Sequence, residues 1–207
     1  MSEQANFGDA WRTMPTLTGR HVTLSPTIRA DRDGILTAFA TGLEGAFHTT
    51  VPNPETIQAW YERIEREQAA GRSMPFTVRD ARGEIAGVTR FLRMAQAHRR
   101  LEIGGTVYAT RVQRTGLNTE AKMLLLTHAF EVLGCYCVQI RTDFLNRQSR
   151  AAIERLGARM DGVIRGHVIL NDGHYRDSVL YSILEHEWPG VKRNIAALMA
   201  RYEGKGA

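Results

Sequence analysis

The chain has 207 residues, of which 43% are hydrophobic and 24% charged, as is typical of one soluble globular domain with or without a short extension. Its formal charge of +5 would suit a polyanion, but the arginines are scattered along the sequence, so we expect no nucleic-acid partner. Neither a signal peptide nor an apolar run of transmembrane length is recognisable, which predicts a cytoplasmic protein with no membrane partner. The two cysteines are too few for a structural zinc site, so no metal is expected.

The first half of the sequence predicts a short strand, two helices and two further strands. Brief alternation of apolar and polar residues indicates the first strand, and apolar residues at helical spacing indicate both helices. Gly71 follows the second helix, where glycine commonly ends a helix. The expected elements are strand 20–24, helices 31–41 and 55–70, and strands 74–79 and 85–92.

The segment 100–108 predicts a strand that two glycines interrupt. Strict alternation divides its side chains between two faces, with Leu101, Ile103 and Val107 on one and Glu102, Thr106 and Tyr108 on the other. Paired glycines such as Gly104 and Gly105 mark either a bulge or a place where another group approaches the backbone closely. Taken alone, the segment is also compatible with a simpler interpretation, in which close packing of neighbouring atoms leaves no room for a side chain at these two positions.

The second half predicts a buried helix, a strand, a second helix and a hairpin. The first of these helices is apolar on most sides, and Gly134 ends it. Asn146 is a natural N-cap for the next helix, and residues 171–173 have the composition of a hairpin turn. The expected elements are helix 119–133, strand 136–141, helix 146–156, and strands 163–170 and 177–184. This order predicts an α/β (α+β) protein with a mixed sheet and helices on its faces.

The turn 113–118 lies between the interrupted strand and the buried helix. A helix N-terminus presents unpaired N–H groups and a partial positive charge, both of which suit a phosphate. Gly116 removes the Cβ that would block close approach, and Arg114 adds a donor. The turn has neither the three glycines of a GxGxxG fingerprint nor the ending of a Walker loop, so a plain turn before a helix is the alternative interpretation.

Five segments in this order give the sequence a resemblance to a known family. They are LEIG at 101–104, GLNTEA at 116–121, NRQSRAAI at 146–153, LGA at 156–158 and DG at 172–173. As a set they resemble the GCN5-related N-acetyltransferases (GNAT), in the branch that includes the ribosomal-protein alanine and serine N-acetyltransferases. The resemblance implies an N-terminal extension over 1–16, an acetyltransferase domain over 17–188 and a helical tail over 189–207. It also implies a mixed, mostly antiparallel sheet of six to seven strands with helices on both faces.

The same resemblance implies an acetyl-CoA site on the turn and on the elements beside it. Backbone N–H groups of 114–119 would hold the pyrophosphate, and the backbone near Val107 and Tyr108 would pair with the pantetheine arm as an added strand. Asn146 would bind a pantetheine amide. Where the family's loop usually has Gly or Ala this chain has Asn118, which tolerates left-handed conformations. The implied acetyl-CoA-binding residues are Val107, Tyr108, Gln113, Arg114, Thr115, Gly116, Leu117, Asn118, Thr119, Asn146 and Ser149.

Transfer of an acetyl group to a primary amine requires a neutral amine, a stabilised oxyanion and a proton for the departing thiolate. By the resemblance, Ser149 would be the acid, and either Glu102 or His167 would be the base, unless water relays the proton. A strand N–H opened by a bulge near Gly104 would stabilise the oxyanion. The predicted function is therefore N-acetylation of an amine, and a non-catalytic acyl-CoA-binding sensor of the same fold is the alternative.

The sequence leaves the amine acceptor open between a protein N-terminus and a small molecule. In the family the acceptor pocket is built from the early helices and the late hairpin, here residues 39–47, Trp60 and residues 167–175. Glu44 and other acids in these segments would attract a cationic amine. The amphipathic tail after Trp188 is expected to pack on the outside of the domain or on a second subunit, which allows a homodimer.

Overall fold

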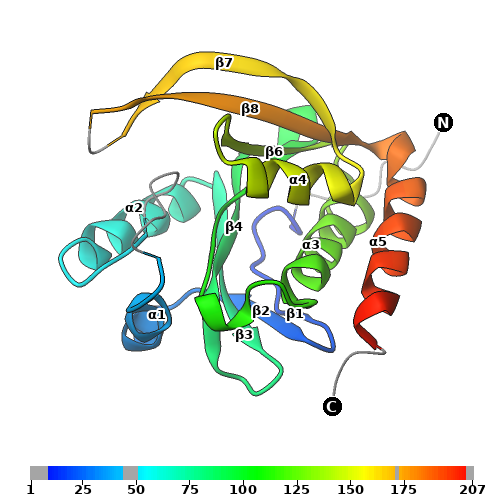
Figure 1. The fold of residues 1–207 in the computed structure, drawn as a ribbon. Helices are drawn as coiled ribbons and strands as arrows, with labels where there is room; N and C mark the ends of the chain where they lie inside the picture. The colour runs from blue at the N-terminus through cyan, green and yellow to red at the C-terminus, as the bar shows by residue number, and fades with distance from the viewer. Residues whose placement is uncertain (1–8, 44–50, 171–172, 204–207) are drawn as a thin grey trace.

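One mixed sheet runs through the protein (Figure 1). The computed structural model describes residues 9–43, 51–170 and 173–203. The strands in these ranges are β1 (Leu17–Thr18), β2 (Val22–Pro26), β3 (Ser73–Asp80), β4 (Ile85–Ala95), β5 (Arg100–Tyr108), β6 (Cys137–Asp143), β7 (Arg159–Ile169) and β8 (Tyr175–Leu184). They form a single sheet in the order β1-β2-β3-β4-β5-β6-β8-β7. The pair β5 and β6 is parallel, and the other neighbours are antiparallel.

This sheet confirms the predicted fold class and corrects the predicted number of strands. It has eight strands, where six to seven were expected. The strand that the sequence did not reveal is β1, whose Leu17 and Thr18 pair with Leu24 and Thr23 of β2. Two residues are too few for alternation to be recognised, so only the tertiary pairing defines this strand.

Helices cover both faces of the sheet, as the sequence predicts (Figure 1). They are α1 (Arg32–Phe39), α2 (Ile57–Ala69), α3 (Leu117–Thr127), α4 (Arg147–Leu156) and α5 (Trp188–Glu203). On one face α1 and α2 form an apolar cluster that includes Ile35, Ile57 and Tyr61. On the other face α3, α4 and α5 pack over the main core. Among the helices of the described ranges, none is both long and apolar enough to cross a membrane.

The start of α3 is fixed to the far edge of the sheet. The helix expected over 119–133 is α3 followed directly by a π-helical turn, His128–Val132. The Glu120 carboxylate accepts the backbone N–H groups of Arg20 at 2.9 Å and His21 at 2.6 Å, in the turn between β1 and β2. The first turn of α3, where the predicted ligand turn ends, is thereby held in place from the side of the sheet.

Both ends of the described chain contribute to the main core. Trp11, in the predicted N-terminal extension, is 4% exposed and donates its indole N–H to the Leu133 carbonyl at 2.9 Å. α5, in the predicted tail, packs against α3 and buries Ile195 completely. The division of the chain at residues 17 and 188 stays a prediction, but residues on both sides of it share one core.

A bulge in β5 changes the face on which its later side chains lie. The register with β4 shifts by one residue between Gly104 and Val107, and Gly105 has a left-handed φ of 57°. The prediction that Val107 shares a face with Leu101 and Ile103 is therefore wrong. Leu101 and Ile103 lie in the main core, whereas Val107 packs with α1 and α2. One inserted residue reverses the alternation of every side chain beyond it.

Candidate active site

β5 and β6 separate in the middle of the sheet, and a cavity opens there. Their parallel pairing ends at Ile103 and Ile140. β5 nevertheless continues to Tyr108, so beyond Ile103 one edge of this strand has no β6 residue paired with it. The cavity has a volume of about 550 Å³, and residues Gly104 to Tyr108 form part of its wall. An extended ligand can add to such an edge as a further strand.

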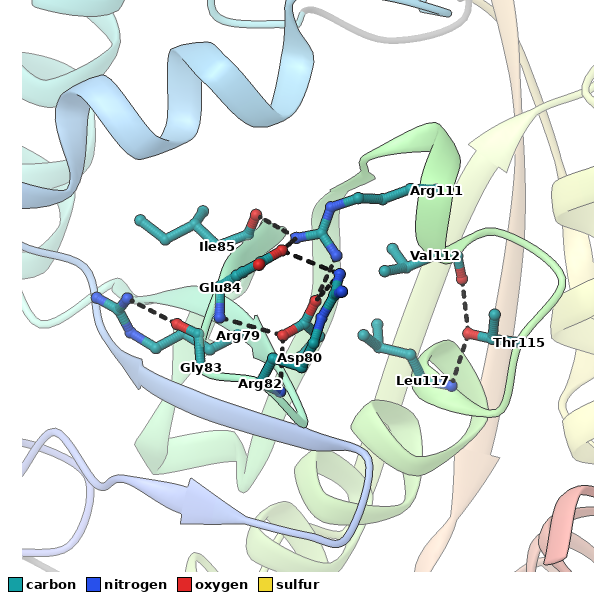
Figure 2. Close-up of polar contacts among 10 residues, drawn as sticks. All are labelled: Arg79, Asp80, Arg82, Gly83, Glu84, Ile85, Arg111, Val112, Thr115 and Leu117. Carbon is teal, nitrogen blue, oxygen red and sulfur yellow. Dashed lines mark hydrogen bonds and ion pairs between the residues drawn. The ribbon is translucent and has the colours of Figure 1, made fainter. Parts of the chain in front are cut away.

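The turn before α3 is braced internally and anchored to a neighbouring strand (Figure 2). The Thr115 hydroxyl donates to the Val112 carbonyl at 2.7 Å and accepts the Leu117 N–H at 3.3 Å. Arg111, immediately before the turn, forms an ion pair with Asp80 at the end of β3. The Thr115 side chain thus supports the turn itself, and these contacts fix the turn's backbone conformation without a contribution from any ligand group.

Arg114 and Gly116 give this turn its shape. Arg114 has a left-handed φ of 62°, which directs the chain into α3. Gly116 is the N-cap of α3 and has no side-chain oxygen, so the first-turn N–H groups receive no hydrogen bond from it. A Cβ on Gly116 would lie 3.2 Å from Cγ of Tyr202 in α5. Packing against α5 is therefore a second reason for glycine here, beside the predicted approach of a phosphate.

The start of α4 brings two further predicted residues to the cavity wall. Asn146 is the N-cap, as predicted, because its Oδ1 accepts the Ser149 N–H at 2.9 Å. The cap uses the carbonyl oxygen of Asn146 and leaves its side-chain NH₂ as a donor for a ligand. Both Asn146 and Ser149 line the cavity. Capping and ligand binding are therefore compatible in the same side chain.

Glu102 lies in the cavity wall within a network of charged groups. It is 3% exposed, and its Oε2 accepts from Arg93 at 2.9 Å and lies 3.3 Å from a guanidinium nitrogen of Arg141. Arg141 also lies 3.2 Å from Nε2 of His167. Nδ1 of His167 lies 3.0 Å from the Ser178 hydroxyl. The two predicted base candidates, Glu102 and His167, are thus connected through one guanidinium.

The neighbours of His167 define its protonation. A guanidinium can only donate, so Nε2 accepts from Arg141 and Nδ1 carries the proton that faces Ser178. Burial, followed by the positive charges of Arg141, Arg93 and Arg176, lowers the pKa of His167 from its ordinary value of 6.5. His167 is therefore neutral at pH 7, and Arg141 already occupies its lone pair.

Lys122 is a cavity residue that the sequence analysis did not single out. The bulge in β5 turns Thr106 toward α3, where its hydroxyl accepts from the Lys122 ammonium at 3.1 Å and contacts Thr89 at 2.8 Å. Lys122 is 7% exposed and pairs with no carboxylate of the described residues. Burial lowers its pKa from 10.5 to about 8. The sequence contains an indication of this buried charge, because a lysine interrupts an otherwise apolar helix face.

The cavity brings together most of the predicted site residues. Those that line it are Glu102, Val107, Tyr108, Gln113, Arg114, Asn118, Asn146, Ser149 and His167. Thr115, Gly116, Leu117 and Thr119 are not among the lining residues: the Thr115 hydroxyl braces the turn, Leu117 lies in the main core, and Thr119 accepts from Arg155 at 3.4 Å. Trp60 and Leu43 line the cavity at the predicted acceptor pocket. Residues 44–47 and 171–172 of that pocket lie outside the described residues.

A splayed parallel strand pair, a braced turn before a helix and a capped second helix define the class of acyl-CoA-dependent acyltransferases. In agreement, residues 21–159 match the family described as "Acetyltransferase (GNAT) domain". The chain belongs to this family, which confirms the resemblance inferred from the sequence.

Individual relatives agree with this assignment. A Bacillus subtilis (strain 168) protein named "Putative ribosomal N-acetyltransferase YdaF" is 36% identical over 110 residues, which are 53% of this chain and 59% of that relative's length. A GCN5-related N-acetyltransferase from Brucella melitensis has a TM-score of 0.80 at 28% identity, covering 90% of this chain and 86% of that chain. Mycobacterium smegmatis RimJ, solved with CoA-disulfide, has a TM-score of 0.78 at 20% identity, covering 90% and 96%, and so shares the fold.

Proposed function

We propose that this protein transfers the acetyl group of acetyl-CoA to a primary amine by direct attack of the amine on the thioester. The observation that carries the proposal is the free edge of β5, which lies in one cavity with the turn before α3 and the start of α4. GNAT acetyltransferases use acetyl-CoA. Residues of the cavity and of the turn before α3 offer suitable groups to its pyrophosphate and to its pantetheine arm.

The phosphates of acetyl-CoA suit the turn and α3. The first-turn N–H groups of α3 and the guanidinium of Arg114 offer donors to the pyrophosphate. Lys122 adds a buried ammonium that pairs with no carboxylate of the described residues. The pantetheine arm would pair with the backbone of Val107 and Tyr108, and the side-chain NH₂ of Asn146 would donate to one of its amides.

In the reaction the amine nitrogen forms a C–N bond to the thioester carbon, which gives a tetrahedral intermediate with an oxyanion, and the C–S bond breaks when this intermediate collapses. The oxyanion would be stabilised by a β5 N–H that the bulge at Gly105 frees from pairing with β4. Ser149 would donate the proton that the thiolate takes up. The proton of the amine would pass to Glu102, directly or through water, because the lone pair of His167 is engaged by Arg141.

Release of free CoA thiol tests the reaction. The purified protein is mixed with acetyl-CoA and a panel of amines and N-terminal peptides, and the thiol is followed by a colour reagent. We expect thiol release that depends on the amine, and an N-acetylated product by mass spectrometry. Tight acetyl-CoA binding without release for any amine would instead favour the non-catalytic sensor.

An asparagine outside the cavity supplies a control for the binding site. Asn146→Ala should raise the KM for acetyl-CoA about tenfold, because it removes a donor to the pantetheine. Asn53→Ala removes a similar side-chain-to-backbone hydrogen bond, since Asn53 Oδ1 accepts the N–H of Thr56, the N-cap of α2, at 2.9 Å. Both variants should lose about 1 kcal/mol of stability, but Asn53→Ala should keep the KM. Equal KM values in the two variants would contradict the assigned role of Asn146.

A further inference from the structure

Guanidinium groups surround the cavity near Glu102. The arginines that line it there are Arg63 of α2, Arg90 and Arg93 of β4, Arg141 of β6 and Arg176 of β8. Glu102 is the single carboxylate residue among the described residues of the cavity wall. These arginines come from four elements, so the fold, not a run of charge in the sequence, brings them together.

Among the described residues, the following ion pairs of these arginines involve fewer carboxylates than guanidiniums. They are Glu67 with Arg90 at 2.6 Å, Glu102 with Arg93 at 2.9 Å and with Arg141 at 3.3 Å, and Asp143 with Arg176 at 3.8 Å. Two of the guanidiniums, those of Arg93 and Arg141, share Oε2 of Glu102. Burial lowers the pKa of Arg141, as expected for a cation held away from water.

Arg93 is directed to this place by an unfavourable backbone conformation. Its φ is 50°, in the left-handed region, at a second bulge where β4 loses register with β5 after Leu92. Such a conformation is costly for a residue other than glycine, and a bulge redirects a side chain. Here the redirected guanidinium reaches Glu102 while its side chain stays 54% exposed. A strained residue that buries little surface indicates a role in binding more than in packing.

From this arrangement we infer that the acceptor is an amine that carries a carboxylate or a phosphate close to its nitrogen. An anion gains charge-assisted hydrogen bonds from Arg93 and Arg141. An amine without an anion would meet an excess of positive charge. An anionic acceptor differs from the cationic amine that acids of the acceptor pocket were expected to attract. Glu44, the residue named for that role, lies outside the described residues, so its role stays a prediction.

The same charges would assist the chemistry. A positive environment favours the neutral form of an amine bound within it, and the neutral form is the nucleophile. The anionic group would hold the acceptor by its acidic end, and the guanidiniums would help its nitrogen to lose a proton. The inference rests on the proposed acetyltransferase function, so its test must distinguish the failure of one from the failure of the other.

Matched acceptors that differ in one anionic group provide the test. Alanine is compared with alaninamide, and phosphoethanolamine with ethanolamine, at saturating acetyl-CoA. We expect the anionic member of at least one pair to have a kcat/KM higher by about tenfold or more, and the better pair identifies the anion as carboxylate or phosphate. Equal values, or a preference for the neutral-ended members, would overturn the inference and leave the acetyltransferase proposal intact.

A binding measurement covers the case in which none of these amines is acetylated. Calorimetry then compares phosphoethanolamine and alanine with ethanolamine, using protein saturated with CoA. Binding of an anionic probe without binding of ethanolamine supports the inference even though the proposed reaction fails for these compounds. If no probe binds, or if ethanolamine binds equally well, the inference is wrong.

Arg93→Gln and a matched arginine variant complete the test. Arg93→Gln should raise the KM for the preferred anionic acceptor about tenfold, reduce the difference within its pair and leave the KM for acetyl-CoA unchanged. Arg82→Gln alters an exposed arginine that pairs with Glu84 outside the cavity, and it should change neither KM. A purely structural role for Arg93 would change the melting temperature without changing the preference within the pair.

Discussion

The cavity has two halves, and they offer their ligands different kinds of groups. The acyl-CoA half is the wall formed by the free edge of β5, the turn before α3 and the start of α4, and the acceptor half is the wall around Glu102 and the five arginines. In the acyl-CoA half, the donors are mainly backbone groups at the free edge of β5 and at the start of α3. In the acceptor half, they are guanidiniums that converge from four elements. Backbone donors follow from the fold and suit a cosubstrate that the whole family shares, whereas side chains can change without altering the fold. We therefore propose that acceptor choice depends on the arginines and acetyl-CoA binding on the backbone.

Gly105 lies between the two halves, and of the variants considered Gly105→Ala should lower kcat/KM the most. A Cβ there would lie 2.9 Å from Nε of Arg90, which Glu67 holds at 2.6 Å, and the φ of 57° strains any side chain. We expect kcat/KM to fall about 100-fold or more for both substrates, measured by steady-state kinetics, because reacting groups displaced by a fraction of an ångström lose alignment.

Gly71→Ala is the control for the backbone strain alone. Gly71 has a φ of 67°, and a Cβ there would meet no atom within 4 Å. Its replacement should cost roughly 1–2 kcal/mol of stability and leave kcat/KM unchanged. If Gly105→Ala and Gly71→Ala lose activity equally, the bulge in β5 does not align the reacting groups of the two halves.

Glu102→Gln should have the next largest effect and would show which half depends on this carboxylate. If Glu102 receives the proton of the amine, kcat should fall about 100-fold while the KM for acetyl-CoA stays the same. Glu65→Gln, at an exposed ion pair with Arg29, serves as the control and should leave kcat intact. A normal kcat with a raised KM for the acceptor would mean that Glu102 only positions Arg93 and Arg141.

Lys122→Met should separate stability from binding in the acyl-CoA half. Because the pKa of Lys122 is about 8 in the folded protein and 10.5 in the unfolded chain, the unfolded chain binds its proton more tightly. Below pH 8 the full cost of the buried charge is present, and stability rises as pH increases from about 8 to 10.5. The variant should gain about 1–3 kcal/mol at pH 7 and lose that rise, as measured by urea unfolding.

The same variant should bind acetyl-CoA about tenfold more weakly, because it removes a positive charge from the cavity wall. Lys192→Met changes an ammonium that is 44% exposed and pairs with Glu131, so it should alter neither buried charge nor acetyl-CoA affinity. Lower stability of Lys122→Met together with unchanged acetyl-CoA affinity would show that Lys122 serves only the packing of α3.

Ser149→Ala should have the smallest effect on catalysis among these variants. Water can supply a proton to the thiolate in place of the hydroxyl, so we expect kcat to fall by about tenfold or less. The KM for acetyl-CoA should change less than kcat, because the Asn146 cap contacts the backbone N–H of Ser149 and survives the loss of its hydroxyl. An unchanged kcat would remove Ser149 as the acid.

Local sequence was sufficient for most of the fold and for the position of the turn and the cap that line the cavity. Asn146 was recognised as an N-cap and the turn 113–118 as a link between strand and helix, because caps and turns depend on adjacent residues. The glycine pair suggested a bulge, but strict alternation placed Val107 on the wrong face. An inserted residue reverses a strand's faces, and the sequence does not say whether the insertion occurs.

The acceptor half could not be predicted in the same way. Arg63 and Arg176 lie more than a hundred residues apart in the sequence and line the same cavity. The arginines are scattered along the sequence, but four strands and helices of the fold bring five of them to one cavity wall. Lys122 was not singled out, because a helix that is apolar on most sides predicts burial of the helix without showing which of its polar side chains is buried with it.

The contact between Gly116 and Tyr202 has a consequence for anyone who shortens this protein. The ring of Tyr202 lies against the N-cap of α3, although the resemblance ends the acetyltransferase domain at residue 188. A clone that stops there would keep every described residue of the cavity wall and lose the aromatic ring that backs the turn before α3. A weakly active truncated preparation would therefore indicate a missing support, not a missing site.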